Sequence, residues 1–300
     1  MKETQHISVL LKETVDGLNL KDGGVYVDAT LGGAGHSEQI CKSGFKDITL
    51  IGIDADKEAI ERSKKRLEKY ECNLITEIAY NDQIPDVLKK NNIQKVDGIM
   101  FDLGMSSDQL DQSKRGFSFQ KNEPLLMSMR SENIDSHLTA REVVNQWGEE
   151  SIADILYGYG EEKYSRKIAK GIVEARAIAP ILTTYQLSDI IADSVPNSYI
   201  KRGRNPATKT FQALRIVVNN ELERLKIALR DSFNAIGSGG RIAVITFHSL
   251  EDRIVKNFFR DLEKEGKGKK TTKKPIKPSQ QEVLSNPRSR SAQLRIFEKN

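Results

Sequence analysis

A short β-prone segment followed by a glycine loop is the feature that most restricts how this chain can fold. Val25–Val27 favour a strand, Asp28 ends it, and the run TLGGAG leads into a predicted helix near Ser37–Cys41. Glycines suit such a loop because they accept positive φ and let backbone N–H groups approach a ligand closely. The pattern therefore predicts a strand, a ligand-binding loop and a helix in immediate succession.

A second acidic strand end indicates what the loop binds. The run LIGIDAD at Leu50–Asp56 contains Asp54, and a carboxylate at a strand tip can accept hydrogen bonds from the hydroxyls of a ribose. The dinucleotide pattern G-x-G-x-x-G fails because Glu38 stands where its third glycine would be, and no P-loop motif is present. Two strand-end acids around a glycine loop favour S-adenosylmethionine (SAM), with another nucleotide or an ordinary α/β turn as alternatives.

Further β-prone segments complete a predicted α/β sheet. They occur at 73–79, 96–103, 241–247 and 292–298, and strongly helical runs such as the one that follows Asp54 separate the earlier ones. Strands and helices that alternate at this spacing predict a mostly parallel sheet. Ligands of such sheets bind at the carboxyl ends of the strands, which would bring Gly33–His36, Asp54, Tyr80 and Asp102 together. His248 follows the fifth strand at the same edge.

The strand signals fade between residues 117 and 199. Helical patterns replace them at 139–147, 150–157, 161–178 and 184–194, which predicts an inserted helical subdomain. The α/β pattern resumes at Asn205, with a single long helix that runs to Gly237 and is expected to pack on the sheet. We therefore predict a methyltransferase-like domain in two parts, 1–115 and 205–300, around a helical subdomain at 116–204.

Composition limits the class of protein. The 300 residues are 38% hydrophobic, no run of 18 apolar residues occurs, and the first 15 residues lack the apolar segment of a signal peptide. A globular, cytoplasmic protein without membrane contact is expected. Cys41 and Cys72 are the only cysteines, and their spacing supports neither a disulfide framework nor a zinc site, so no metal is predicted.

Basic residues accumulate toward the C-terminus. Residues 261–300 hold 11 Lys and Arg against 5 Asp and Glu, whereas residues 1–110 hold 14 against 19. This asymmetry suits a polyanionic partner, although a solvated lysine-rich segment would look the same. The lysines between 264 and 280 repel one another among glycines and prolines, so this segment is predicted to be disordered without a partner.

With these runs in view, the chain closely resembles the RsmH (MraW) family of bacterial rRNA small-subunit methyltransferases. The resemblance extends nearly end to end and includes DATLGGAGHS, DGIMFDLGMSSDQLD, YGEEKYSRKIA, NPATKTFQALRIVVNNEL and GGRIAVITFHSLEDRIVK. It implies a class I SAM-dependent methyltransferase fold, Rossmann-like, with an inserted helical domain. It also implies methyl transfer to N4 of a cytosine in the decoding region of 16S rRNA, within the small ribosomal subunit. Whether the protein also forms a homodimer is left open by the sequence.

The family's cofactor contacts can be carried over residue by residue. They fall on Ala34, Gly35, His36, Asp54, Tyr80, Asp102 and Gln109. Asp102 is the first candidate for the group that accepts hydrogens from the cytosine amine, and His248 is the second. The family usually reads PLDMRMD where this chain has PLLMSMR at Pro124–Arg130, which puts substrate binding or rate in doubt and leaves SAM binding intact.

Two other functions compete with this interpretation. The altered loop at Pro124–Arg130 is compatible with a non-catalytic RNA-binding or ribosome-assembly factor that keeps a methyltransferase fold. A SAM enzyme that acts on a protein or a small molecule is disfavoured by the family resemblance and by the basic C-terminal third.

Overall fold

The computed structural model describes residues 8–132, 134, 137–200 and 205–300, and these form two compact units. One unit joins the chain up to Met105 to Leu222–Asn300, and the other is Ser106–Glu221. The second unit begins before and ends after the insertion predicted at 116–204. None of the helices in the described residues has both the length and the apolar content that a membrane span requires.

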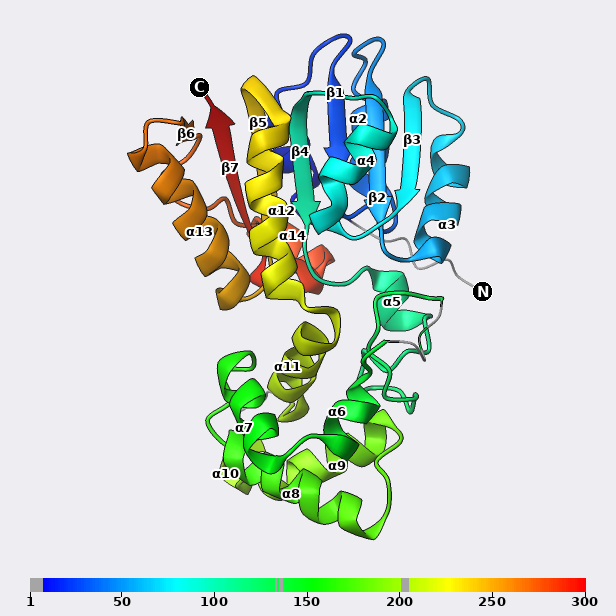
Figure 1. Ribbon diagram of the computed structural model, residues 1–300, viewed down its shortest axis with the longest axis vertical. Helices are drawn as coiled ribbons and strands as arrows, with labels where there is room; N and C mark the ends of the chain where they lie inside the picture. The colour runs from blue at the N-terminus through cyan, green and yellow to red at the C-terminus, as the bar shows by residue number, and fades with distance from the viewer. Residues whose placement is uncertain (1–7, 133, 135–136, 201–204) are drawn as a thin grey trace. The chain divides into compact units, whose positions relative to one another are not determined.

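A seven-stranded sheet is the centre of the first unit (Figure 1). Its order is β3-β2-β1-β4-β5-β7-β6, the first five of these strands are parallel, and β7 pairs antiparallel with both of its neighbours. The strands are β1 (Val25–Asp28), β2 (Thr49–Asp54), β3 (Asn73–Ile78), β4 (Val96–Asp102), β5 (Ile236–Thr246), β6 (Gly268–Lys270) and β7 (Gln293–Lys299). The predicted strands and the predicted class I methyltransferase fold are confirmed.

Alternating apolar residues give the sheet two buried faces. Ile51 and Ile53 belong to a cluster with three helices, α4 (Ile84–Lys90), α12 (Glu221–Ala235) and α13 (Ser249–Lys264). Leu50 belongs to the opposite cluster, with α1 (Leu11–Gly17), α2 (Gly35–Cys41) and α3 (Lys57–Leu67). Each fully buried aliphatic side chain contributes roughly 1.5 to 3 kcal/mol, and period-two alternation along each strand places such side chains on both faces of the sheet.

The second unit is helical, as predicted. Its helices are α5 (Ser107–Asp111), α6 (Ala140–Gln146), α7 (Glu149–Gly158), α8 (Ser165–Ile178), α9 (Thr184–Ser194), α10 (Asn197–Ile200) and α11 (Ala207–Asn219). Thr139 and Thr183 start α6 and α9 with capping boxes, in which each threonine side chain accepts from a backbone N–H of the first turn. The four predicted helical segments are confirmed, and local capping explains where two of them begin.

The prediction of one long helix packed on the sheet is wrong. Asn220 adopts a left-handed conformation with φ of 50°, which ends α11, and α12 begins at the next residue. Asparagine tolerates this conformation better than most residues. The first of the two helices, α11, packs on α6, α7 and α9 of the helical unit. Apolar spacing continues across the break, so periodicity alone could not reveal it.

The prediction of disorder at 264–280 is also wrong. Gly268–Lys270 form β6 on the edge of β7, and Ile276 exchanges two backbone hydrogen bonds with Leu294. Lys269 pairs with Glu298 at 3.0 Å, and Lys270 pairs with Glu263 at 2.7 Å. The acids that neutralise these lysines come from other elements of the fold, so a count of local charge overestimates the repulsion.

The two cysteines are joined, contrary to the sequence-based expectation. Cys41 and Cys72 form a disulfide with their Cα atoms 5.7 Å apart. Cys41 is the last residue of α2, and Cys72 directly precedes β3. The fold brings these two element ends together across 31 residues of sequence, which the spacing of two cysteines cannot predict.

Candidate active site

The glycine loop after β1 is held from outside by a neighbouring strand and helix. Gly32 has φ of 48°, and its N–H donates to Asp54 Oδ2 at 2.8 Å. Its carbonyl accepts from the Ser63 hydroxyl of α3 at 2.9 Å, and the Gly33 carbonyl accepts from the Arg66 guanidinium. Strand end and helix therefore set the shape of the loop, which fits a preorganised ligand site.

Glu38 anchors the same arrangement on α2. Its carboxylate accepts from Arg66 and from the Tyr70 hydroxyl, each at 2.6 Å. Burial raises its pKa, but the hydrogen bonds from Tyr70 and Arg66 outweigh burial and lower the pKa to about 2. A carboxylate that stays charged throughout the physiological range thus ties α2 to α3.

The predicted loop residues lie where the loop enters α2. Ala34 is fully buried with φ of 58°, and a Cβ on Gly35 would lie 1.9 Å from Ser8 Oγ, so a larger residue at this position would force the Ser8 side chain to move. His36 is buried, its Nε2 lies 3.0 Å from the Val9 carbonyl oxygen, and its Nδ1 lies 3.7 Å from an Asp102 carboxylate oxygen. An imidazole therefore links the N-terminal segment to the end of β4.

Acidic side chains gather at the carboxyl ends of the central strands. Asp28 is buried and accepts from Ser37 Oγ at 2.7 Å, yet burial raises its pKa to about 6. Asp102 is 21% exposed, while its Oδ1 is covered and has no hydrogen-bond donor among the described residues. Burial, and then the charges of Asp28 and Glu251, raise the pKa of Asp102 to about 8.

This clustering of carboxyl groups indicates the charge of the ligand. Asp54 adds to the charge felt by Asp28, so the acids of β1, β2 and β4 act on one another in sequence. Carboxylates that raise one another's pKa store unfavourable interaction energy, which a nearby cation relieves. The site is therefore complementary to a positively charged ligand.

Two of the predicted cofactor residues have neighbours outside this cluster. Tyr80 follows β3, and the Arg224 guanidinium of α12 lies 3.7 Å from its ring centroid. Gln109 belongs to the helical unit, where its side-chain oxygen accepts from the Ser106 N–H at 3.0 Å. The structure thus brings Ala34, Gly35, His36, Asp54 and Asp102 together, with Tyr80 at the neighbouring strand end.

Some residues that shape this site escaped sequence reasoning. Arg66 occupies a helix position that looks like ordinary polar surface, and Ser63 lies on the apolar side of its helix without a sign that it contacts the loop. Glu251 was expected at the end of the fifth strand, but its burial there was not. Asp28 gave a usable signal, because an acid directly before a glycine loop belongs to the SAM pattern. The others could be recognised only from the packing of α3 and α13.

His248 has a structural task that its position at the strand end did not reveal. It is the N-cap of α13, where its Nδ1 accepts from the Glu251 N–H at 3.4 Å. One carboxylate oxygen of Glu251 accepts from the Phe247 N–H at 2.8 Å, and its other oxygen lies 3.1 Å from His248 Nε2. Because Nδ1 is used by the cap, only Nε2 could take part in proton transfer.

Substitutions at His248 should separate the capping role from a catalytic one. His248→Asn keeps a good N-cap and is expected to retain catalytic activity within about threefold, whereas His248→Ala should lose about 1 kcal/mol of unfolding free energy. Denaturant unfolding and initial-rate assays on both variants make the comparison. A loss of activity by about a hundredfold in a stable His248→Asn protein would instead show that the imidazole takes part in the chemistry.

The unusual segment Pro124–Arg130 has a well-defined backbone within the helical unit. The Arg115 guanidinium donates to the carbonyls of Ser128 and Met129, and the Asn219 amide bonds to Met127 O and Met129 N–H. Contacts from outside the segment therefore hold its backbone. These supports bind backbone atoms, so they do not depend on the altered side chains, of which Ser128 is buried and Leu126 and Arg130 are partly exposed.

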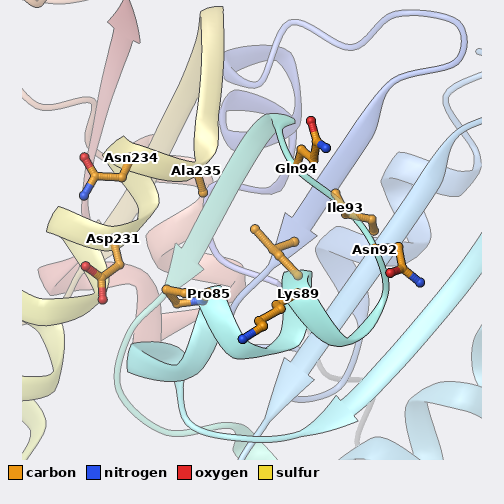
Figure 2. Close-up of a pocket in the computed structure, with 9 residues that line it drawn as sticks. Pro85, Lys89, Asn92, Ile93, Gln94, Asp231, Asn234 and Ala235 are labelled. Atoms are coloured by element: carbon orange, nitrogen blue, oxygen red, sulfur yellow. The ribbon is translucent and has the colours of Figure 1, made fainter.

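A surface cavity elsewhere in the first unit does not belong to this site. It has a volume of about 600 Å³ and lies between α4 and α12 (Figure 2). Its polar side chains, among them Lys89, Asn92 and Asp231, come from separate elements and do not converge on one point. None of the predicted site residues lines it.

Comparison with known proteins agrees with the geometry. The model of the MraW methylase family matches residues 3–300. A protein from Clostridium botulinum (strain Kyoto / Type A2), named ribosomal RNA small subunit methyltransferase H, is 49% identical over 314 residues and 99% of each chain. Proteins of the same name from Halothermothrix orenii and Clostridioides difficile are 46% and 44% identical over 98% and 99% of each chain.

Proposed function

Because this chain belongs to the MraW methylase family, we propose that it transfers a methyl group from SAM to N4 of a cytosine in 16S rRNA, in the cytoplasm. The observation that carries the proposal is the group of interacting carboxyl side chains beside the glycine loop, with Asp102 among them. SAM has a sulfonium and an ammonium group, so its charge suits these acids. The comparisons support the family and the rRNA class, and the particular base is our inference from the family resemblance.

The residues of the site fit SAM in their chemistry as well as in their charge. Asp54, at the end of β2, would accept hydrogen bonds from the ribose hydroxyls, and Tyr80 would stack on the adenine. Ala34–His36 would lie against the amino-acid portion of the ligand, and Gln109 stays a predicted cofactor contact. When bound, SAM supplies an activated methyl carbon on a positively charged sulfur.

The protein's main contribution to the reaction is orientation. The cytosine amine is a weak nucleophile because its lone pair is delocalised into the ring, and holding two reactants in line can contribute roughly 7 to 11 kcal/mol. We assign Asp102 as the acceptor of an N4 hydrogen. As the new N–C bond forms and the S–C bond breaks, a proton leaves N4, and the Asp102 carboxylate is a suitable group to receive it.

Analysis of nucleosides in 16S rRNA tests the proposed function directly. Cells that lack the gene should contain unmethylated cytosine at one position, and the intact gene should restore N4-methylcytosine there. If rRNA from both strains has the same nucleosides while the purified protein binds 16S rRNA, the protein is a non-catalytic RNA-binding or assembly factor.

The substrate RNA requires a basic surface, and the C-terminal segment offers three suitable lysines. Lys273, Lys274 and Lys277 are exposed and have no acidic partner among the described residues, unlike Lys269 and Lys270. Replacing all three with alanine should weaken binding of 16S rRNA fragments. It should also reduce the slope of log affinity against log salt by roughly 2, because each phosphate contact contributes about 0.7 to 0.9.

A matched triple variant controls for the general loss of positive charge. Lys64, Lys65 and Lys89 are also exposed lysines, and they lie on α3 and α4. Their replacement by alanine lowers the net charge equally and should leave the salt slope close to that of the unmodified protein. Equal slopes for the two triple variants would mean that the C-terminal segment makes no specific contact with RNA.

A further inference from the structure

Tyr80 has an unusually close cationic neighbour. The Arg224 guanidinium carbon lies 3.7 Å from the centroid of the Tyr80 ring, the distance of a stacked pair. The same guanidinium donates to both carboxylate oxygens of Asp82, at 2.8 and 2.7 Å. Arg224 and Asp82 are partly buried, with 27% and 15% of their side chains exposed. A planar cation fixed by a carboxylate thus covers one face of the ring.

The side of the sheet from which Arg224 approaches Tyr80 decides which face of the ring stays open to a ligand. Its helix α12 packs on the face of the sheet that also has α4 and α13, whereas the glycine loop leads into α2 on the opposite face. Ile78 pairs in register with Asp54, so these two side chains lie on the glycine-loop face, and Ile78 is 53% exposed there. Arg224 therefore supports Tyr80 from behind, and only the other ring face can receive a base.

We propose that Arg224, held by Asp82, is a positioning residue that fixes the Tyr80 ring as the platform for the adenine of the cofactor. The inference rests on the proposed SAM site and adds a residue that makes no contact with the reacting atoms. Fixing an aromatic ring in advance lowers the entropy cost of binding the base, because its orientation is already set. The effect should appear in affinity for SAM and leave the chemical step unchanged.

Kinetics of the Arg224→Ala enzyme test this assignment. KM for SAM and the Kd of S-adenosylhomocysteine should rise about tenfold, while kcat stays within about twofold. The substitution weakens binding of the ground state and of the transition state equally, so the rate of the bound complex does not change. Arg224→Lys should recover little of the loss, because an ammonium group can still pair with Asp82 but has no planar surface to stack on the ring. Arg230→Ala, on the same helix and 65% exposed, is the matched control and should behave like the unmodified enzyme.

A double-mutant cycle distinguishes positioning of Tyr80 from a general structural role. In a Tyr80→Ala background, the Arg224→Ala change should have almost no further effect on the Kd, because the group it positions is gone. Independent, additive losses would overturn the assignment, as would tighter SAM binding by Arg224→Ala, which would mean that the arginine blocks the base. If Arg224→Ala does not fold, Asp82→Asn can replace it in the cycle with Tyr80→Ala, because this change removes the carboxylate that holds Arg224.

Failure of this inference can be told from failure of the proposed function. If the unmodified protein binds SAM and methylates RNA while Arg224 variants bind SAM normally, the positioning role is wrong and the function stands. If the unmodified protein shows no affinity for SAM, the proposed function itself is wrong.

Discussion

Replacing Asp102 with asparagine is expected to abolish methyl transfer while making the ligand-free protein more stable at pH 8. The pKa of Asp102 is raised to about 8, above the value of about 3.9 in an unfolded chain. Because the folded state holds this proton more tightly, its contribution to stability is complete below about pH 4 and is lost as the pH rises through about 8. Asparagine does not ionise, so the Asp102→Asn protein does not lose this stability as the pH rises.

The two effects have separate magnitudes. At pH 8, Asp102→Asn should raise the unfolding free energy by on the order of 2 kcal/mol, since each pKa unit corresponds to about 1.4 kcal/mol and part of the gain is offset by a poorly paired amide. The kcat/KM for RNA should fall by about a hundredfold or more, as expected when a proton acceptor is lost. Urea unfolding between pH 4 and 9, and single-turnover assays, measure the two quantities.

The pH profile of the unmodified enzyme provides a further check. Below about pH 8 its kcat/KM should increase with pH and then level off, because only the ionised Asp102 can attract the cation and accept a hydrogen. Asp97→Asn, at the amino end of the same strand, removes an ion pair with Lys21, while its amide oxygen can still accept from the Val25 N–H. This control should lose stability and keep the profile, and an Asp102→Asn enzyme with near-normal activity would disprove the catalytic assignment.

Asp54→Ala should eliminate measurable SAM binding. Asp54 accepts from the N–H groups of Gly32 and Asp56, both at 2.8 Å, so it fixes the glycine loop in addition to facing the expected ribose. Hydrogen bonds to a charged group contribute about 1.5 to 3 kcal/mol each, and losing two of them to the ribose would weaken binding by at least about a hundredfold. Isothermal titration calorimetry with SAM measures the change.

Asp54→Asn refines the comparison. An amide can still accept one hydrogen bond from the loop, so this variant should bind SAM with a Kd between those of the unmodified and alanine proteins. Circular dichroism confirms that the sheet is retained, and Asp97→Ala tests loss of a carboxylate at the other end of the strands. If Asp54→Ala binds SAM within about fivefold of normal, the ribose assignment fails.

Local sequence predicted much of this protein. Period-two alternation gives the strands and assigns Leu50 and Ile51 to opposite faces, because side chains along a strand point alternately up and down. Strand-end acids and glycines marked Asp54 and Asp102, since parallel strands end at one edge. The starts of α6 and α9 also depend on local sequence, because the groups that satisfy a helix start lie within four residues of it.

Tertiary structure decided what depends on partners distant in sequence. The break at Asn220, the pairing of Cys41 with Cys72, and the ordering of Lys269 and Lys270 all follow from contacts that no local pattern contains. The raised pKa of Asp102 likewise requires burial and two acids from other elements. Sequence fixes the residue types at each strand end, whereas packing sets their distances and solvation, and these determine which of them can do chemistry.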